Sequence, residues 1–133
     1  MRAQVAFEYI VIVGLVIAFL VPVWSYIASM NDQATQSLSV SQAQTAAKKI
    51  VSAADLVYTQ GPPTQITLDV FVPRGVQNAT IVNSTVWFRV YYTSGVTDAT
   101  ATALGSLQGT LPRSEGLYKF TITAVSDYVN ISY

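Results

Sequence analysis

The chain has 133 residues, with seven basic and seven acidic side chains and a formal net charge of zero. This length suggests one domain, the missing basic surplus argues against nucleic-acid binding, and a hydrophobic content of 51% argues against disorder. There is no Cys and no His, so disulfides, the common zinc sites and the commonest general base are excluded.

The sequence begins with a short basic segment that leads directly into a long apolar stretch. The small residue Ala3 follows Arg2, and the lone carboxylate of Glu8 precedes a run from Tyr9 to Met30 that has no charged side chain. A conventional secretory signal has its small-residue cleavage site after the apolar region, whereas here the small residue comes before it. Cleavage after Ala3 would therefore leave the apolar segment on the mature chain.

The segment from Arg2 to Tyr9 resembles the class III signal peptide of archaeal type IV pilins of the adhesion type. The resemblance implies a leader of residues 1–3 that a prepilin peptidase removes by cutting between Ala3 and Gln4. Glu8 then becomes the fifth residue of the processed chain, as the family requires, although the family more often has Gly before the cut. It further implies a helical homopolymer at the archaeal cell surface, assembled by a pilus ATPase and a membrane platform.

Residues 4–30 are expected to form the membrane or filament-core part of a long helix. The uncharged run is about long enough to cross a hydrocarbon core of roughly 30 Å. Arg2 keeps its own end in the cytoplasm by the positive-inside rule, and Trp24 and Tyr26 lie where aromatic rings favour the membrane–water boundary. An ordinary single-span anchor explains the same composition.

Residues 31–60 continue the helical pattern in amphipathic form and are expected to pack on the head. Apolar residues recur at spacings of three and four, which predicts a buried stripe: Val40, Ala43, Ala47, Ile50, Val51, Ala54 and Val57. Pro62 and Pro63 cannot continue a helix. We therefore expect one helix from about Val5 to Tyr58.

Pro22 and Glu8 carry the assembly hypotheses. Pro22 leaves the Ala18 carbonyl without its usual donor and is expected to kink or loosen the helix; the family resemblance suggests a role in filament packing, and simple tolerance of Pro in membrane helices is the alternative. A carboxylate costs about 2.5–3.5 kcal/mol at the centre of a membrane helix. The family role for Glu8 is to pair with the new amino group of Gln4 on a neighbouring subunit, and the alternative is a passive position among the lipid headgroups.

Residues 64–133 read as a β-rich head. Alternating or strand-forming runs occur at 66–70, 78–82, 86–92, 118–124 and 128–133, and the Thr-, Ser- and Gly-rich stretch 93–116 predicts a weak strand with exposed loops. The fold class is therefore α+β, with a long hydrophobic helix followed by a small antiparallel β-sandwich. The sequence of Val72–Val76, together with a hairpin expected from Tyr118 to Tyr133, resembles archaeal pilin head domains. This resemblance implies an immunoglobulin-like sandwich.

Three sequons for N-glycosylation occur in this half, at Asn78, Asn83 and Asn130. Chance is the alternative explanation, because the β-rich half has many Ser and Thr residues. Glycans at Asn78 and Asn83 would mark positions that face solvent. The Thr- and Ser-rich loop from Thr93 to Thr110 is a candidate outward variable surface, either glycosylated or adhesive.

No motif for chemistry is present: there is no phosphate-binding Gly-rich loop, and the acidic residues are scattered. We expect no catalytic site, no metal and no cofactor other than N-linked glycans. The sequence thus favours a structural subunit of an archaeal type IV pilus-like adhesion filament, present in the cell membrane as its precursor. The alternative is a monomeric extracellular β domain, an adhesin or solute-binding module, held by a single membrane span.

Overall fold

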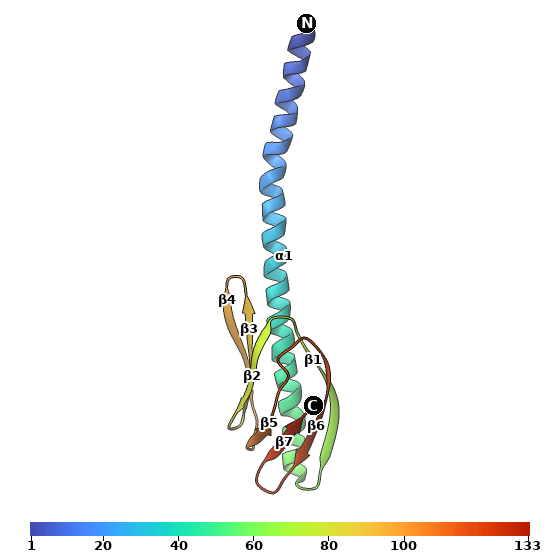
Figure 1. Ribbon diagram of the computed structural model, residues 1–133, viewed down its shortest axis with the longest axis vertical. Helices are drawn as coiled ribbons and strands as arrows, with labels where there is room; N and C mark the ends of the chain where they lie inside the picture. Colours follow the sequence, from blue (N-terminus) through green and yellow to red (C-terminus); the bar gives the residue numbers. More distant parts are fainter. The chain divides into compact units, whose positions relative to one another are not determined.

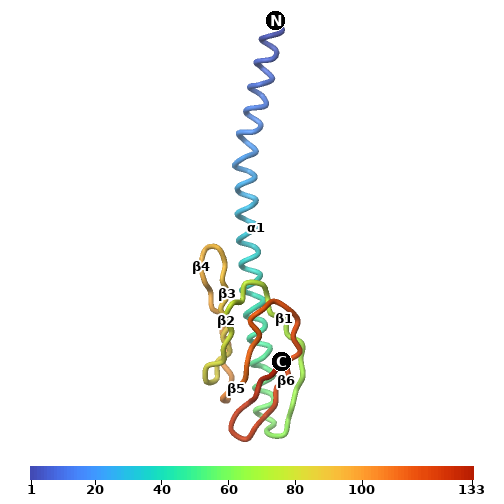
Figure 2. Tube along the Cα trace, viewed as in Figure 1, coloured from blue at the N-terminus to red at the C-terminus, as the bar shows by residue number.

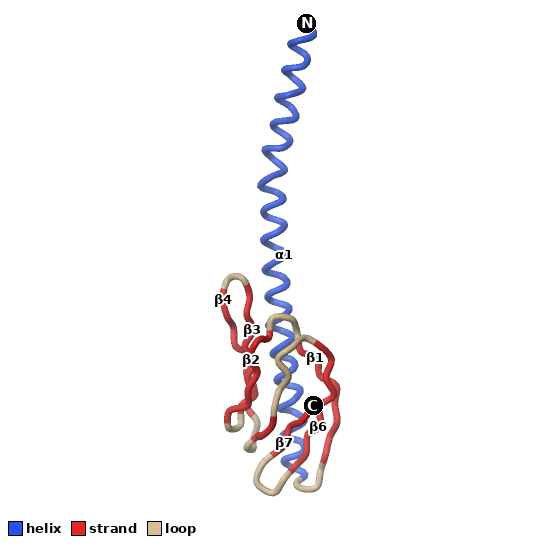
Figure 3. Tube along the Cα trace, viewed as in Figure 1, coloured by secondary structure: helices blue, strands red, loops and turns tan.

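A computed structural model describes all residues, 1–133. One helix, α1 (Arg2–Gln60), precedes seven strands, as Figures 1 and 3 show. The strands are β1 (Gln65–Val72), β2 (Val76–Val82), β3 (Thr85–Tyr92), β4 (Gly95–Thr102), β5 (Leu107–Gly109), β6 (Gly116–Ala124) and β7 (Val129–Ser132). The chain divides into two compact units, Met1–Thr35 and Gln36–Tyr133, which are described separately below. The α+β class predicted from the sequence is confirmed.

Helix α1 ends at the Gly-Pro-Pro segment, as predicted. Gly61 has a positive φ of 76°, a conformation that favours glycine after a helix. Its N–H donates to the Val57 carbonyl at 3.0 Å, which satisfies one of the last helical acceptors. The two prolines that follow then prevent the helix from continuing.

The seven strands form two sheets, and the first is mixed rather than purely antiparallel. Its strand order is β1-β6-β7-β5, and the second sheet has the order β2-β3-β4. All neighbours are antiparallel except β5 and β7, which pair in parallel from Leu107 with Val129 to Gly109 with Ile131. The expected antiparallel sandwich is corrected on this point, because β5 lies beside β7 and not beside its sequence neighbours. The arrangement does not establish the immunoglobulin-like fold.

Strand β4 is stronger than the sequence predicted. The stretch 93–116 was expected to hold a weak strand and loops, but β4 pairs with β3 along eight consecutive positions, from Thr85 with Thr102 to Tyr92 with Gly95. Its Thr residues are good strand formers, and the two-residue connection at Thr93–Ser94 makes this a tight hairpin. The tube in Figure 2 follows the chain through this hairpin.

The core of the second unit forms between one face of α1 and the inner faces of both sheets. Every residue of the predicted stripe is buried except Val40, which is half-buried and packs at its edge. The helix contributes mostly small side chains, and Ala43, Ala47 and Ala54 are fully buried. Phe88 from β3 and Phe120 from β6 supply the largest buried side chains. Small residues on the helix thus leave room for bulky residues on the strands.

Polar side chains of α1 form hydrogen bonds with backbone groups of the β-rich half at three places, two on strands and one in a loop. Gln44 Nε2 donates to the Thr100 carbonyl of β4 at 2.8 Å, and Lys49 Nζ donates to the Asp69 carbonyl of β1 at 2.9 Å. Asp55 Oδ1 accepts from the Leu104 N–H at 2.8 Å. Because β4 and β1 are edge strands, two of these bonds reach backbone groups that no neighbouring strand can pair.

Candidate functional site

The first unit, Met1–Thr35, is an apolar helical segment with no buried residue. All 35 of its residues are exposed, and large side chains such as Phe7, Phe19 and Trp24 are 67%, 72% and 79% exposed. The mean hydropathy reaches 2.6 over an 18-residue window, so this helix is long and apolar enough to cross a membrane. A continuous apolar surface of this extent requires lipid or protein to cover it.

The residues of the predicted leader and assembly sites lie on this exposed helix. Ala3, Gln4 and Glu8 are all solvent-exposed within α1. The two ion pairs of the structure join Arg74 to Glu115 and Arg89 to Asp98, so neither involves Glu8. The carboxylate thus stands on an apolar helix without a cation from its own chain, and its pairing with Gln4 of another copy stays a prediction.

Helix α1 continues through Pro22 without a break. The kink or looser turn expected there stays a prediction. The residues around it form a shallow apolar recess of about 350 Å³, lined by Leu20, Val21, Val23, Trp24 and Ile27.

The three sequons occupy different environments. Asn78 is exposed on β2 beside a register shift, and Asn83 is exposed in the turn between β2 and β3. Asn83 has a φ of 53°, which asparagine tolerates better than most residues, so the turn by itself accounts for its presence. Asn130 is half-buried on β7, which has β6 on one side and β5 on the other. Asn78 and Asn83 thus both face solvent, as residues that carry glycans must; which sequon carries a glycan stays a prediction.

One polar cluster was not predicted from the sequence. On β3, the Arg89 guanidinium lies 4.7 Å from the centre of the Trp87 ring and holds the Asp98 carboxylate of β4 with two hydrogen bonds of 2.8 and 3.2 Å. The bond from Arg89 is the main cause that lowers the pKa of Asp98, and the same bond raises the pKa of Arg89. The buried Trp87 Nε1–H adds to the lowering at Asp98, although it is not at hydrogen-bonding geometry. Only the cross-strand register, which pairs Arg89 with Asp98, reveals this cluster.

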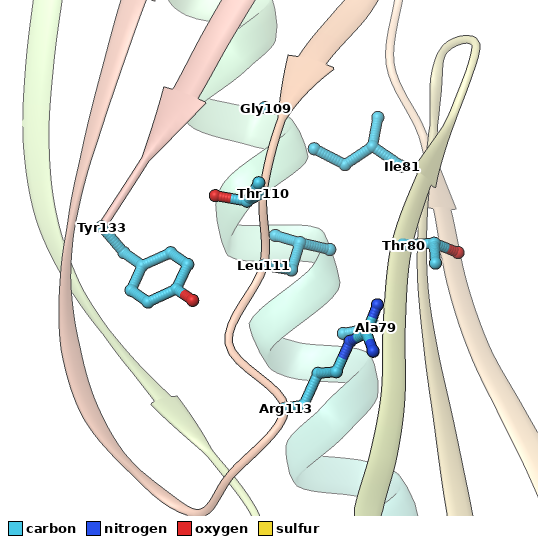
Figure 4. Close-up of a pocket in the computed structure, with 8 residues that line it drawn as sticks. All are labelled: Ala79, Thr80, Ile81, Gly109, Thr110, Leu111, Arg113 and Tyr133. Carbon is cyan, nitrogen blue, oxygen red and sulfur yellow. The ribbon is translucent and has the colours of Figure 1, made fainter.

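A cleft opens where the two sheets diverge. Beside it the sheets are joined by the Leu107 N–H, which donates to the Asn83 carbonyl at 2.9 Å. The cleft has a volume of about 510 Å³ and is lined by Ala79, Thr80, Ile81, Gly109, Thr110, Leu111, Arg113 and Tyr133. Figure 4 shows Ile81 and Leu111 facing the gap from opposite sides, with the Arg113 guanidinium reaching toward Ala79. Arg113 is the one charged side chain in this lining.

No group of three or more His, Cys, Asp or Glu side chains lies close enough together to hold a metal ion. The exposed apolar helix that contains Ala3, Gln4, Glu8 and Pro22 is therefore the candidate functional site, because its large apolar side chains are exposed. The architecture, a long N-terminal apolar helix followed by β-sheets, is pilin-like.

Comparison with known proteins adds no assignment: no protein-family model, no curated protein and no solved structure matches this chain significantly.

Proposed function

We propose that this chain is the structural subunit of an archaeal type IV pilus-like adhesion filament. The observation that carries the proposal is the complete exposure of the apolar segment in Met1–Thr35, preceded by the short basic leader. A surface of this kind is stable in lipid before assembly and against other copies of the same helix after assembly. One surface then serves both the membrane precursor and the polymer.

The processing step gives the proposal its chemistry. A prepilin peptidase cuts between Ala3 and Gln4, which removes Arg2 and creates a new amino group on Gln4. That cation pairs with the Glu8 carboxylate of a neighbouring copy as the subunit leaves the membrane, so that neither charge stays unpaired in an apolar interior. A pilus ATPase and its membrane platform drive the step, and the role of the chain is structural rather than catalytic.

The β-rich unit faces outside the cell in this proposal. The sequons at Asn78 and Asn83 are exposed, which is compatible with N-linked glycans on the filament surface. Adhesion to cells or surfaces is then a property of this unit, whereas polymerisation is a property of the apolar helix.

A second function is a monomeric β domain anchored by one membrane span. It is favoured by the helix itself, which meets the length and hydropathy of a membrane span without any partner. Under this alternative the leader stays attached, and Glu8 lies at the level of the lipid headgroups.

The intact mass of the protein in material sheared from the cell surface separates the two. A filament subunit lacks Met1, Arg2 and Ala3, and any excess mass comes in glycan-sized steps. If the protein instead stays with the membrane fraction and keeps its first three residues, the filament proposal is wrong and the anchored domain replaces it.

A further inference from the structure

The apolar helix contains a backbone acceptor that has lost its donor. Pro22 lies inside the continuous helix α1 and has no N–H, so the carbonyl of Ala18 has no partner four residues further on. The helical carbonyl of Ala18 points toward the following turn, where the side chains of Val21 and Pro22 carry no donor. In water such a carbonyl is solvated, but in lipid or in a helix bundle an unpaired carbonyl is costly.

The same segment contains a side-chain donor that has no acceptor. The indole N–H of Trp24 can only donate a hydrogen bond. Trp24 is 79% exposed. The side chains that line the recess with it are all apolar: Leu20, Val21, Val23 and Ile27. Trp24 cannot reach its own Ala18 carbonyl, because six residues at 3.6 per turn place the two about 120° apart around the helix. Each copy therefore brings one unmet acceptor and one unmet donor on different faces.

We propose that the Trp24 indole N–H of one copy donates a hydrogen bond to the Ala18 carbonyl of a neighbouring copy. This inference rests on the proposed polymerisation of the apolar helix. Lipid tails offer neither a donor nor an acceptor, whereas a second copy supplies both an indole N–H donor and a carbonyl acceptor. The bond satisfies two groups that every copy would otherwise bury unpaired.

The geometry of the contact follows from the two faces. Because the donor face of one helix meets the different acceptor face of the next, the contact is head-to-tail, and such contacts generate open helical arrays. Trp24 lies about 9 Å further along the helix axis than Ala18, at 1.5 Å for each residue. Side chains in helices lean toward the N-terminus, so neighbouring copies are displaced along the axis by somewhat less than about 9 Å.

The test is a double-mutant cycle on sheared filaments of the full chain. Trp24→Phe removes the donor, Pro22→Ala restores an N–H to the Ala18 carbonyl, and the double variant carries both changes. The readout is the rate at which subunits are released from the filaments in a fixed detergent concentration. Tyr26→Phe, which removes the hydroxyl of a nearby exposed aromatic residue, is the matched control.

Trp24→Phe is expected to release subunits about five- to tenfold faster in the natural background, the effect of one lost hydrogen bond in apolar surroundings. In the Pro22→Ala background the same change is expected to have less than half of that effect, and Tyr26→Phe is expected to have little effect. Equal effects of Trp24→Phe in both backgrounds would overturn the proposal.

If Pro22→Ala fails to assemble, a helical reconstruction of the natural filament decides. It is expected to place Trp24 Nε1 within hydrogen-bond distance of Ala18 O of an adjacent copy, and another nearest acceptor would refute the contact. Filaments without this contact leave the proposed function intact. A protein that forms no filaments at all refutes both.

Discussion

Replacing Gly109 by Ala tests the close approach of β5 to β7. A Cβ at Gly109 would lie 1.9 Å from the Ile131 carbonyl oxygen and 2.8 Å from its carbonyl carbon, and the φ of Gly109 is +137°. A change of side-chain rotamer cannot relieve the contact, because the close atoms belong to the backbone of Ile131 on the paired strand. The variant must therefore separate β5 from β7.

The cost has two parts. The positive φ of +137°, which L-residues rarely adopt, costs an L-residue about 1–3 kcal/mol. Separation of the strands removes their hydrogen bonds and exposes Leu107, which is 4% exposed in the structure; burial of such a side chain contributes about 2 kcal/mol. We expect the free energy of unfolding to fall by about 3–5 kcal/mol in total.

Urea denaturation of the full chain in detergent, followed by near-ultraviolet circular dichroism, measures this loss. Gly61→Ala is the matched control: Gly61 also has a positive φ, of 76°, but a Cβ there meets no atom within 4 Å. The control has the strain of a positive φ without the steric contact, so its loss is expected to be about 1–2 kcal/mol. If both variants lose the same stability, the reasoning about contact with Ile131 is wrong.

The remaining predictions concern charge, packing, assembly and modification. The pKa of Asp98 is lowered in the folded chain, so its contribution to stability is present above the ordinary pKa of 3.8 and is lost as the pH falls through the lower folded pKa. The difference in urea midpoint between the natural chain and Asp98→Asn is therefore expected to be small and to disappear toward pH 2. A difference that grows in acid would contradict this. Ala47→Leu places a bulky side chain at a fully buried position, and we expect the free energy of unfolding to fall by about 1–3 kcal/mol in the same assay. The matched variant Lys48→Leu, at the exposed neighbouring position, should have almost no effect. Glu8→Ala should still enter the membrane fraction but give few sheared filaments; a normal yield would exclude its pairing role. Asn78→Gln should remove one glycan from the intact mass of the surface protein, and Asn130→Gln should leave the mass of the glycans unchanged, because Asn130 is half-buried on an interior strand.

The long helix was predictable because its signals are local. The apolar run, the stripe from Val40 to Val57 and the Gly-Pro-Pro stop each depend on residues a few positions apart, and α1 has the expected extent within a few residues. The exposed apolar surface that forms the candidate site follows from the same local pattern. Ala46 is also buried, although it lies beside the predicted stripe rather than on it.

The sheet arrangement was less predictable because it depends on pairings between distant segments. The sequence around β4 is rich in Thr, Ala and Gly, and its strand becomes evident only through the register with β3. Likewise, no local pattern announces that β5 runs parallel to β7. The Arg89–Asp98 pair and the bonds from Gln44, Lys49 and Asp55 also join residues that are far apart in sequence, so periodicity gives no sign of them.

The bonds from Gln44 and Lys49 have a consequence for a protein displayed in many copies. Exposed edge strands are templates for sheet growth between molecules, and crowding of identical subunits raises that risk. In this chain one of the two edge strands of each sheet, β1 or β4, gives one of its outward carbonyls to a side chain of α1. Growth of either sheet at β1 or β4 between crowded neighbours would first have to break these bonds, so the helix that supports the core also protects one edge of each sheet against uncontrolled association.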